Sequence, residues 1–457
     1  MKRAPRVPRV PRARPARAGD QNRRQKIAGG DVVSGPDAHE ERPFDARVVV
    51  LHVLARVRGG ERLAPTLRSE LARIAERHDR AYVTDVAYGV LRWEIALDAA
   101  LRPRLDAPER LPPRVRDVLL AGTYERLVRA TPDHAAVHAW VDVVKRGPER
   151  EQGLAGLVNA VLRRVELSPV IGDEALALPG WLADEFRALL GAEHATSAAR
   201  GMLESEPLWL SVLGREATAL LEADGARVLA GPVPGSIAVR APIPLPTLAA
   251  YRQGLVQAQN PASLAVVHAC AVRRDERVLD LCGGNAIKAA GLAARGARVT
   301  SVELDAAISE AGRRNLERLG LQVEHVVADL RHTPDLPPAP IVLLDAPCSG
   351  TGTLRGHPEI KARVTPAAIE SLARLQARLL DTAAALTEVG GKLVYAVCAL
   401  TTAEGPHQID AFLRRHPDFV AETPTLPLET HPAGAGRVIL PTEGLDGFFV
   451  ASLRRSA

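Results

Sequence analysis

Long apolar runs are missing from the sequence. No stretch of about 18 apolar residues occurs, so no segment is expected to span a membrane. The N-terminus also lacks the apolar core of a secretory signal. It is rich in arginine, as a mitochondrial transit peptide would be, but its prolines at positions 5, 8, 11 and 15 are incompatible with the amphipathic helix that such a peptide needs. We therefore expect a cytoplasmic protein that makes no membrane contact.

Cysteine is scarce. The 457 residues contain four cysteines, Cys270, Cys282, Cys348 and Cys398. No two of them form the Cys-x-x-Cys pair that is typical of zinc sites, so no metal is expected. A reducing compartment also argues against disulfides. An isolated free cysteine is ordinarily a small buried apolar residue, so a chemical role for any of the four needs support from its surroundings.

Positive charge is concentrated at the N-terminus. The whole chain carries +5, but residues 1–26 hold ten Lys and Arg against one Asp, a local charge of +9 that leaves −4 for the rest. Because prolines separate these arginines, residues 1–42 are expected to form an extended, disordered basic arm, which suits a phosphate backbone. A tail that only improves solubility is the alternative. The candidate RNA-contacting residues of the arm are Arg3, Arg6, Arg9 and Arg12.

Helical patterns predict an all-α bundle over residues 43–170. Apolar residues recur at helical spacing from Ala46 to Val57, and prolines punctuate the helical stretches that follow. These later helices are expected over 63–77, 79–100, 113–129, 134–146 and 153–165. Residues 171–256 are expected to contain a connecting helix, over 179–204, and a small α/β module with strands near 208–213 and 237–241.

Residues 257–457 alternate between strand and helix patterns. This alternation predicts an α/β domain built on a doubly wound parallel sheet. Its strands are expected over 277–282, 298–304, 323–329, 341–347, 392–398 and 448–453.

Acidic residues end three successive predicted strands of this domain. Ligands of doubly wound sheets bind beyond the carboxyl ends of the strands. Glu303 follows Asp280 by 23 residues, which suits an acid that bonds ribose hydroxyls, and Asp329 stands where an acid can meet an adenine amino group. Because the GxGxxG spacing of dinucleotide sites is absent, S-adenosylmethionine (SAM) is favoured over NAD, although each acid could instead cap a helix. The candidate cofactor loop continues from Asp280 through Cys282, Gly283, Gly284 and Asn285.

Two cysteines end the next two predicted strands. Cys348 lies in the turn Asp345-Ala-Pro-Cys348, and Cys398 ends the following strand, so both thiols can converge on one pocket. Carbon 5 of cytosine becomes nucleophilic only after a thiolate adds to carbon 6. Asp345 would then bond the ring at N3 and the amino group, carbon 5 would attack a methyl donor, and a base would remove the carbon 5 proton. The target base must be unstacked to enter such a pocket.

The chain resembles the bacterial Sun/RsmB branch of RNA cytosine-carbon-5 methyltransferases, which carry an N-terminal NusB-like domain. The resemblance runs from about Phe44 to Leu453. It is carried by the motifs Gly156-Leu-Val-Asn159, Gly254-Leu-Val-Gln-Ala-Gln259, Asp345–Gly350, His357-Pro-Glu-Ile-Lys361, Leu393–Cys398 and Asp446-Gly-Phe-Phe449.

This resemblance implies a NusB-like RNA-binding bundle, a small RRM-like module and a Rossmann-like SAM-dependent methyltransferase domain. It implies that Cys398 is the nucleophile and that Cys348 assists product release, and Lys288 and Asp345 are counted with them as catalytic and cofactor-binding candidates. The implied substrate is 16S rRNA, in an unassembled or partly assembled small subunit, and the chain is expected to act as a monomer. Further candidates for RNA contact are Arg355, His357 and Lys361.

The sequence departs from the family pattern around the cofactor loop and after the nucleophile. The usual Ala-Ala-Pro-Gly-Gly-Lys reads Gly283-Gly-Asn-Ala-Ile-Lys288, Ala399 replaces a serine, and Glu404-Gly405 keeps part of an acidic-Asn motif. Two alternatives therefore stay open. One is an RNA-binding ribosome-assembly factor whose methyltransferase domain has degenerated, and the other is a cytosine-carbon-5 methyltransferase that acts on tRNA.

Overall fold

The computed structural model describes residues 44–166, 177–205, 207–241 and 243–456. The chain divides into two units, Met1–Phe44 and Asp45–Ala457, and the second holds every helix and strand described below. The predicted basic arm lies outside the described residues. Within the described ranges, no helix is long and apolar enough to cross a membrane.

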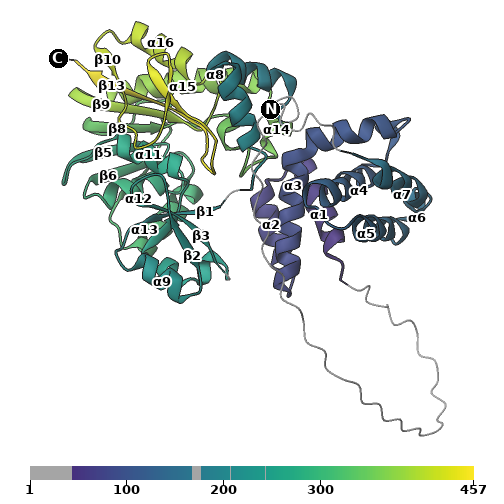
Figure 1. The fold of residues 1–457 in the computed structure, drawn as a ribbon. Coiled ribbons are helices and arrows are strands. Elements are labelled where there is room, and N and C mark those ends of the chain that lie inside the picture. Colours follow the sequence, from purple (N-terminus) through teal and green to yellow (C-terminus); the bar gives the residue numbers. More distant parts are fainter. Residues whose placement is uncertain (1–43, 167–176, 206, 242, 457) are drawn as a thin grey trace, which may run out of the picture. The chain divides into compact units, whose positions relative to one another are not determined.

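An all-α bundle opens the second unit, as the sequence predicts (Figure 1). Its core centres on Trp140, which is fully buried and donates from Nε1 to the buried carboxylate of Glu125 at 2.5 Å. Arg47 pairs with the same carboxylate at 3.2 Å. The helices are α1 (Ala46–Arg58), α2 (Leu63–Leu71), α3 (Arg77–Leu101), α4 (Pro113–Thr123), α5 (Asp133–Lys145), α6 (Glu149–Gln152) and α7 (Ala155–Arg164).

Two predicted helices differ from the observed ones. The helix expected over 63–77 ends at Leu71, because the chain turns there to bury Ile74, whose carbonyl accepts a bond from Arg80 Nε at 2.6 Å. The helix expected over 113–129 is α-helical to Thr123 and then forms a π-helical turn over 124–128. This turn packs the Tyr124 ring onto α3 at Gly89, where a Cβ would lie 1.9 Å from a ring atom.

A kinked helix and a small α/β module connect the bundle to the sheet domain. Helix α8 (Gly180–Gly201) is interrupted at Gly191, whose φ is 76°. The module is an antiparallel sheet in the order β2-β3-β1-β4. Its elements are β1 (Leu208–Val212), α9 (Ala217–Ala223), β2 (Arg227–Ala230), β3 (Ser236–Arg240), α10 (Ala249–Arg252) and β4 (Val256–Ala258).

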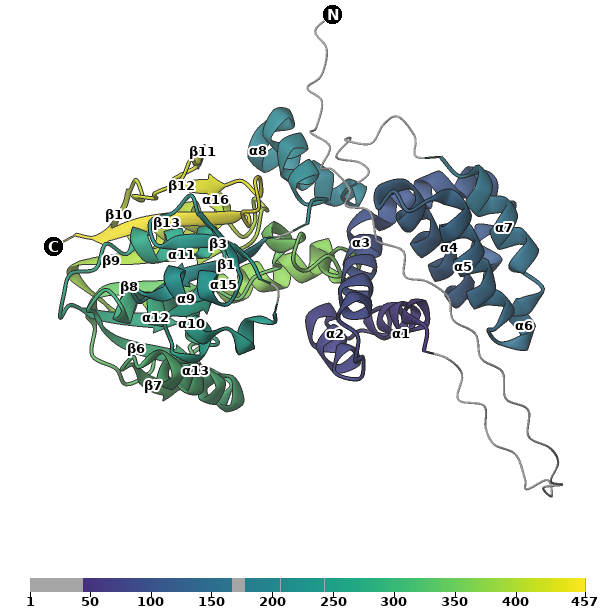
Figure 2. The same cartoon turned by 60° about the horizontal axis from the view of Figure 1, so that its bottom comes forward.

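The last domain is a doubly wound, mostly parallel sheet in the order β11-β12-β13-β9-β8-β5-β6-β7, with β10 paired to β13 (Figure 2). Strands β5 to β9 are parallel, and β13 pairs antiparallel to β9. The strands are β5 (Arg277–Leu281), β6 (Arg298–Glu303), β7 (Glu324–Val327), β8 (Ala339–Asp345), β9 (Thr387–Val397), β10 (Phe419–Glu422), β11 (His431–Ala433), β12 (Gly436–Ile439) and β13 (Phe448–Arg455). The helices are α11 (Pro261–Ala269), α12 (Ile287–Ala293), α13 (Ala306–Leu319), α14 (Ile360–Arg363), α15 (Pro366–Ala385) and α16 (Pro406–Arg415).

Strand order reverses at β5, the middle one of the five parallel strands β9-β8-β5-β6-β7. Chain progression runs outward from β5 through β6 to β7 on one side, and through β8 to β9 on the other. Such a reversal opens a crevice at the carboxyl ends of the strands, where ligands bind in folds of this type. The predicted strand-end residues therefore gather around that crevice. Each of the six strands predicted in this domain is confirmed, with differences of a few residues at the ends.

Candidate active site

The thiols of Cys348 and Cys398 meet at the carboxyl ends of β8 and β9. Strand β8 pairs in parallel with β9, and Asp345 lies opposite Ala396 in that pairing. Cys348 comes three residues after Asp345, and Cys398 two residues after Ala396. Their Sγ atoms lie 3.3 Å apart, and both residues are half-buried.

Cys348 is held as a protonated thiol. Its hydrogen bond with Cys398 is the largest influence on its pKa, followed by burial and by the negative charges of Cys398 and Glu404. All four raise the pKa of Cys348 well above its ordinary value. Because the thiolate is the nucleophilic form, this thiol is kept unreactive as long as its neighbour stays beside it.

A lysine–carboxylate pair lies at the same strand ends. Lys288, in α12, contacts Asp345 Oδ2 through its Nζ at 2.5 Å. Burial alone would lower the pKa of Lys288, but the attraction and hydrogen bond of Asp345 outweigh it, and the pKa is raised. Lys288 therefore stays charged and holds the Asp345 carboxylate in a fixed position.

Asp280 is a buried carboxylate close to this pair. It is fully buried near the end of β5, and neither carboxylate oxygen has a hydrogen-bond partner among the described residues. Burial, the largest cause, and the charge of Asp345 together raise its pKa to about 7, although Lys288 offsets part of their effect. A carboxyl group in such surroundings resists ionisation until a positive charge arrives.

The loop after β5 has three residues with left-handed backbone. Cys282, Gly284 and Ala286 have φ of 60°, 55° and 58°. Left-handed backbone is unfavourable at residues with a side chain, and such strain tends to accumulate at functional sites. A Cβ at Gly283 would lie 2.0 Å from Ser301 Oγ, whereas one at Gly284 would meet no atom within 4 Å. Gly283 thus permits close packing, and Gly284 leaves open space beside the strand ends.

Two further acids border this loop. Glu303 ends β6, and its carboxylate accepts bonds from the backbone N–H groups of Gly284 and Asp305, both at 3.0 Å. Asp329 lies two residues beyond β7 and is bound by the Arg331 side chain at 2.6 Å, which lowers the pKa of Asp329 to about 2. Both acids are half-buried.

These residues fit a cationic, adenosine-containing ligand. The side chain of Asn285 is exposed, and the space over Gly284 is open. SAM carries positive charge on its sulfonium and ammonium groups, and its ribose and adenine offer hydrogen-bonding groups. The carboxylates that could face it end four adjacent parallel strands: Asp280, Glu303, Asp329 and Asp345.

The candidate RNA-contacting residues have different surroundings. Arg355 is buried and donates from Nη2 to the carbonyl of Pro441 at 2.8 Å. Lys361 Nζ donates to the carbonyls of Arg92 and Ala177, and burial lowers the pKa of Lys361 to about 8. His357 is exposed. Of these three, only His357 presents an exposed side chain, and RNA contact by any of them stays a prediction. Arg3, Arg6, Arg9 and Arg12 lie outside the described residues.

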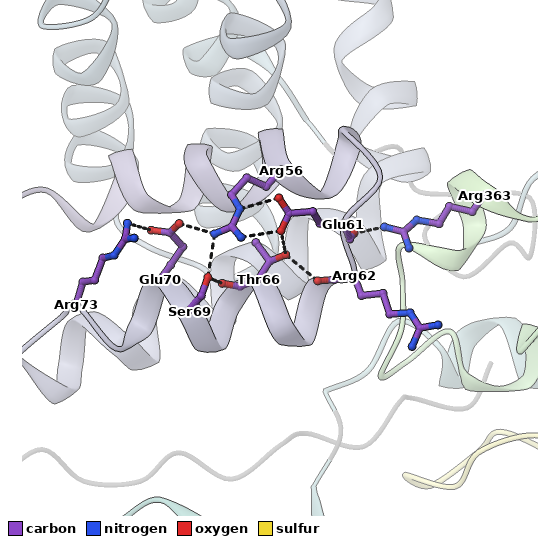
Figure 3. A network of polar contacts seen from close by, with 8 residues as sticks. All are labelled: Arg56, Glu61, Arg62, Thr66, Ser69, Glu70, Arg73 and Arg363. Carbon is purple, nitrogen blue, oxygen red and sulfur yellow. Dashed lines mark hydrogen bonds and ion pairs between the residues drawn. The ribbon is translucent and has the colours of Figure 1, made fainter. Parts of the chain in front are cut away.

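The half-buried position of Lys361 follows from its segment, which contacts the helical bundle. Arg363, two residues on, donates to the backbone carbonyl of Glu61 in the loop between α1 and α2 (Figure 3). The Glu61 carboxylate in turn binds Arg56 at 2.7 Å, which also binds Glu70. The segment that follows Cys348 is thus part of a structural contact, which motif spacing does not reveal.

Sequence reasoning did not assign Glu404 to the site. The residue is fully buried and accepts hydrogen bonds from both turns that carry the thiols. The one available signal was its place six residues after Cys398, in the remnant of the acidic-Asn motif.

The fold and the strand-end acids define a Rossmann-like methyltransferase domain joined to a NusB-type bundle. A family model described as the NusB family matches residues 45–167, and one described as 16S rRNA methyltransferase RsmB/F matches residues 267–454. Ribosomal RNA small subunit methyltransferase B of Thermus thermophilus is 44% identical over 413 residues, covering 90% of this chain and 97% of the relative. The Xanthomonas campestris protein of the same description is 34% identical over 432 residues, covering 90% of this chain and 97% of the relative. The chain belongs to the RsmB/F family of 16S rRNA methyltransferases.

Solved structures agree with this fold. The crystal structure of PH0851 superposes with a TM-score of 0.72 at 21% identity, covering 91% of this chain and all of that one. A methyltransferase homologue from Pyrococcus horikoshii gives a TM-score of 0.54 at 26% identity, covering 63% of this chain and 100% of that one. The multidomain architecture predicted from the sequence is therefore confirmed.

The elevated pKa of Asp280 predicts a pH dependence of stability. Because its pKa is about 7 in the folded protein and 3.8 as the ordinary value, the folded state favours the protonated form. That contribution is complete below about pH 4 and is lost as the pH rises to 7. The free energy of unfolding of the wild type, relative to Asp280→Asn, should therefore fall over this range. Each pKa unit corresponds to about 1.4 kcal/mol.

Denaturant unfolding of both proteins at several pH values measures this difference. Asp275→Asn is the matched control, since the Asp275 side chain is 81% exposed in the same domain. A wild-type-minus-Asp280→Asn difference that stays flat between pH 4 and 7 would show that Asp280 is ionised in the folded protein throughout.

Proposed function

We propose that this protein transfers a methyl group from SAM to carbon 5 of a cytosine in 16S rRNA, with Cys398 as the covalent nucleophile. The observation that carries the proposal is the pair of Sγ atoms 3.3 Å apart at adjacent strand ends. A methyltransferase that acted on an exocyclic amine would need no thiol there, and the cytosine carbon needs one.

Cys398 and Asp345 prepare the cytosine. The Cys398 thiolate adds to carbon 6, and the electron pair of the former double bond moves to carbon 5. The Asp345 carboxylate, held by Lys288 at 2.5 Å, accepts a hydrogen bond from the cytosine amino group and so orients the ring beside Cys398. Bound SAM supplies the electrophilic methyl group that carbon 5 attacks.

Cys348 then completes the reaction. The hydrogen bond and the charge of Cys398 are two of the causes that raise the pKa of Cys348. Once the Cys398 sulfur is bonded to carbon 6 it carries no negative charge, so this cause of the raised Cys348 pKa is removed at the step that needs a base. Cys348 passes its own proton to water and, as a thiolate, takes the proton from carbon 5; the double bond between carbons 5 and 6 re-forms, and Cys398 leaves as a thiolate.

The proposal extends to RNA binding. The arginines of residues 1–26 and the NusB-like bundle would contact the phosphate backbone of 16S rRNA before or during small-subunit assembly, since flipping a base into the crevice requires accessible RNA. The protein would act in the cytoplasm as a monomer.

The RNA class can be tested in cells. Bisulfite mapping of total RNA from a strain that lacks the gene should show loss of one 5-methylcytosine from 16S rRNA. The wild-type gene should restore it and Cys398→Ala should not. If a 5-methylcytosine disappeared from tRNA instead, the substrate would be tRNA and not 16S rRNA. An unchanged methylation map would favour the assembly-factor alternative.

The two thiols should fail in different ways in vitro. Cys348→Ala should stall after methyl transfer and accumulate a protein–RNA adduct that survives denaturing gel electrophoresis. That adduct should require both SAM and RNA. Cys398→Ala should form no adduct and lose at least about three orders of magnitude in turnover. The double variant should also form none.

If Cys348→Ala turned over at the normal rate, Cys348 would have no role in catalysis and would only contribute to packing. An adduct formed by Cys398→Ala but not by Cys348→Ala would reverse the two roles.

A further inference from the structure

Glu404 lies in the loop between β9 and α16, and its carboxylate is fully buried. Oε1 accepts bonds from Ser349 N at 2.8 Å and from Gln376 Nε2 at 3.1 Å. Oε2 accepts bonds from Ser349 Oγ at 2.6 Å and from Thr401 Oγ1 at 3.0 Å. Four bonds from uncharged donors fill the four acceptor positions that the two oxygens of a carboxylate offer.

The donors belong to both thiol-bearing turns. Ser349 directly follows Cys348, and Thr401 lies three residues after Cys398. Gln376, from α15, also donates from Nε2 to the carbonyl of Pro347 at 3.0 Å. Ser349, which follows Cys348, therefore binds this carboxylate directly, and Pro347, which precedes Cys348, is linked to it through Gln376.

The same two turns meet at a second set of contacts. Leu400 N donates to Thr351 Oγ1 at 2.9 Å, and Gly352 N donates to the carbonyl of Cys398 at 3.0 Å. Gly352 lies so close to the neighbouring chain that a Cβ there would be 2.1 Å from the carbonyl oxygen of Gly447. These contacts join the two turns at residues that follow the thiols. Glu404 binds Ser349, directly next to Cys348, and is therefore the connection nearest to Cys348.

We propose that Glu404 is a positioning residue that holds the Cys348 turn against the Cys398 turn and so keeps the two sulfurs adjacent. The consequence for catalysis rests on the proposed covalent mechanism, because the second thiol can assist release only if it stays beside the first. The role of Glu404 in keeping the two sulfurs adjacent does not depend on that mechanism.

Substitutions can separate position from charge. In Glu404→Gln, the amide oxygen can accept from Ser349 N and Gln376, while the amide nitrogen donates to the hydroxyls of Ser349 and Thr401, which can rotate to accept. Glu404→Gln therefore keeps the links without the charge, whereas Glu404→Ala removes both. Thr387→Val is the matched control, because it deletes a buried hydroxyl bond to Ala383 O at the opposite end of β9.

The distance between the sulfurs can be followed without RNA or SAM. A diazenedicarboxamide oxidant takes two electrons and two protons from the thiols as they form a disulfide, and peptide mass spectrometry identifies the Cys348–Cys398 link. We expect the link to form in wild type, Glu404→Gln and Thr387→Val at similar rates. In Glu404→Ala it should form roughly ten- to a hundredfold more slowly, the scale of a thiol displaced by about 1 Å.

A Glu404→Ala protein that cross-links at the wild-type rate would overturn the proposal. Cross-linking slowed equally in Glu404→Ala and Glu404→Gln would also overturn it, because the effect would then come from the charge. If Glu404→Ala fails to unfold cooperatively, Ser349→Ala decides instead, because it loses the hydroxyl bonds to Glu404 and Thr351 and keeps the backbone bond to Glu404. A cross-linking rate unchanged in Ser349→Ala would then overturn the proposal.

A second readout separates this inference from the proposed function. With RNA and SAM, Glu404→Ala should accumulate the same covalent adduct as Cys348→Ala, and Glu404→Gln should not. Absence of an adduct from both Glu404→Ala and Cys348→Ala, with slow cross-linking in Glu404→Ala, would contradict the covalent mechanism and leave the positioning role in place. Adduct in Cys348→Ala alone would contradict the positioning role.

Discussion

The parallel pairing of β8 with β9 is the constraint on which the candidate active site depends. It sets Asp345 opposite Ala396, and the few residues beyond that register bring Cys348 and Cys398 within 3.3 Å of each other. A one-residue slip in register would turn the strand-end side chains to the other face of the sheet. Strand β9 is in turn fixed between β8 and β13, so the thiols stand on the interior of the sheet and not on a mobile edge.

Electrostatics around the thiols follows from burial. Acids end four adjacent parallel strands, and Lys288 is the cation held against Asp345 among them. The buried Asp280 keeps a raised pKa, and the pKa of Cys348 is raised mainly by its hydrogen bond with Cys398 and by burial. Such a crevice favours a positively charged methyl donor, and the proposed mechanism uses the second thiol only after the first has reacted.

Much of this arrangement could be predicted from the sequence, because strand patterns and strand-end residues obey local rules. The β8 and β9 patterns alone bring Cys348 and Cys398 to one edge of the sheet. The internal hydrogen bonds of Arg355 and Lys361 could not be predicted, since their partners, the carbonyls of Pro441 and Arg92, lie 86 and 269 residues away. Glu404 was missed for the same reason: its four hydrogen bonds come from three separate segments, and only folding brings them together.

The central claim is that Cys398 bonds to cytosine, and the most direct test is to locate that bond. RNA that carries 5-fluorocytidine at the target position should trap the adduct after methyl transfer, because fluorine at carbon 5 cannot be removed as a proton is. Protease digestion and mass spectrometry should then find the methylated fluorocytidine on the peptide that contains Cys398. A nucleotide found on Cys348, or methylation of unmodified RNA without any trapped adduct on the analogue, would contradict the account.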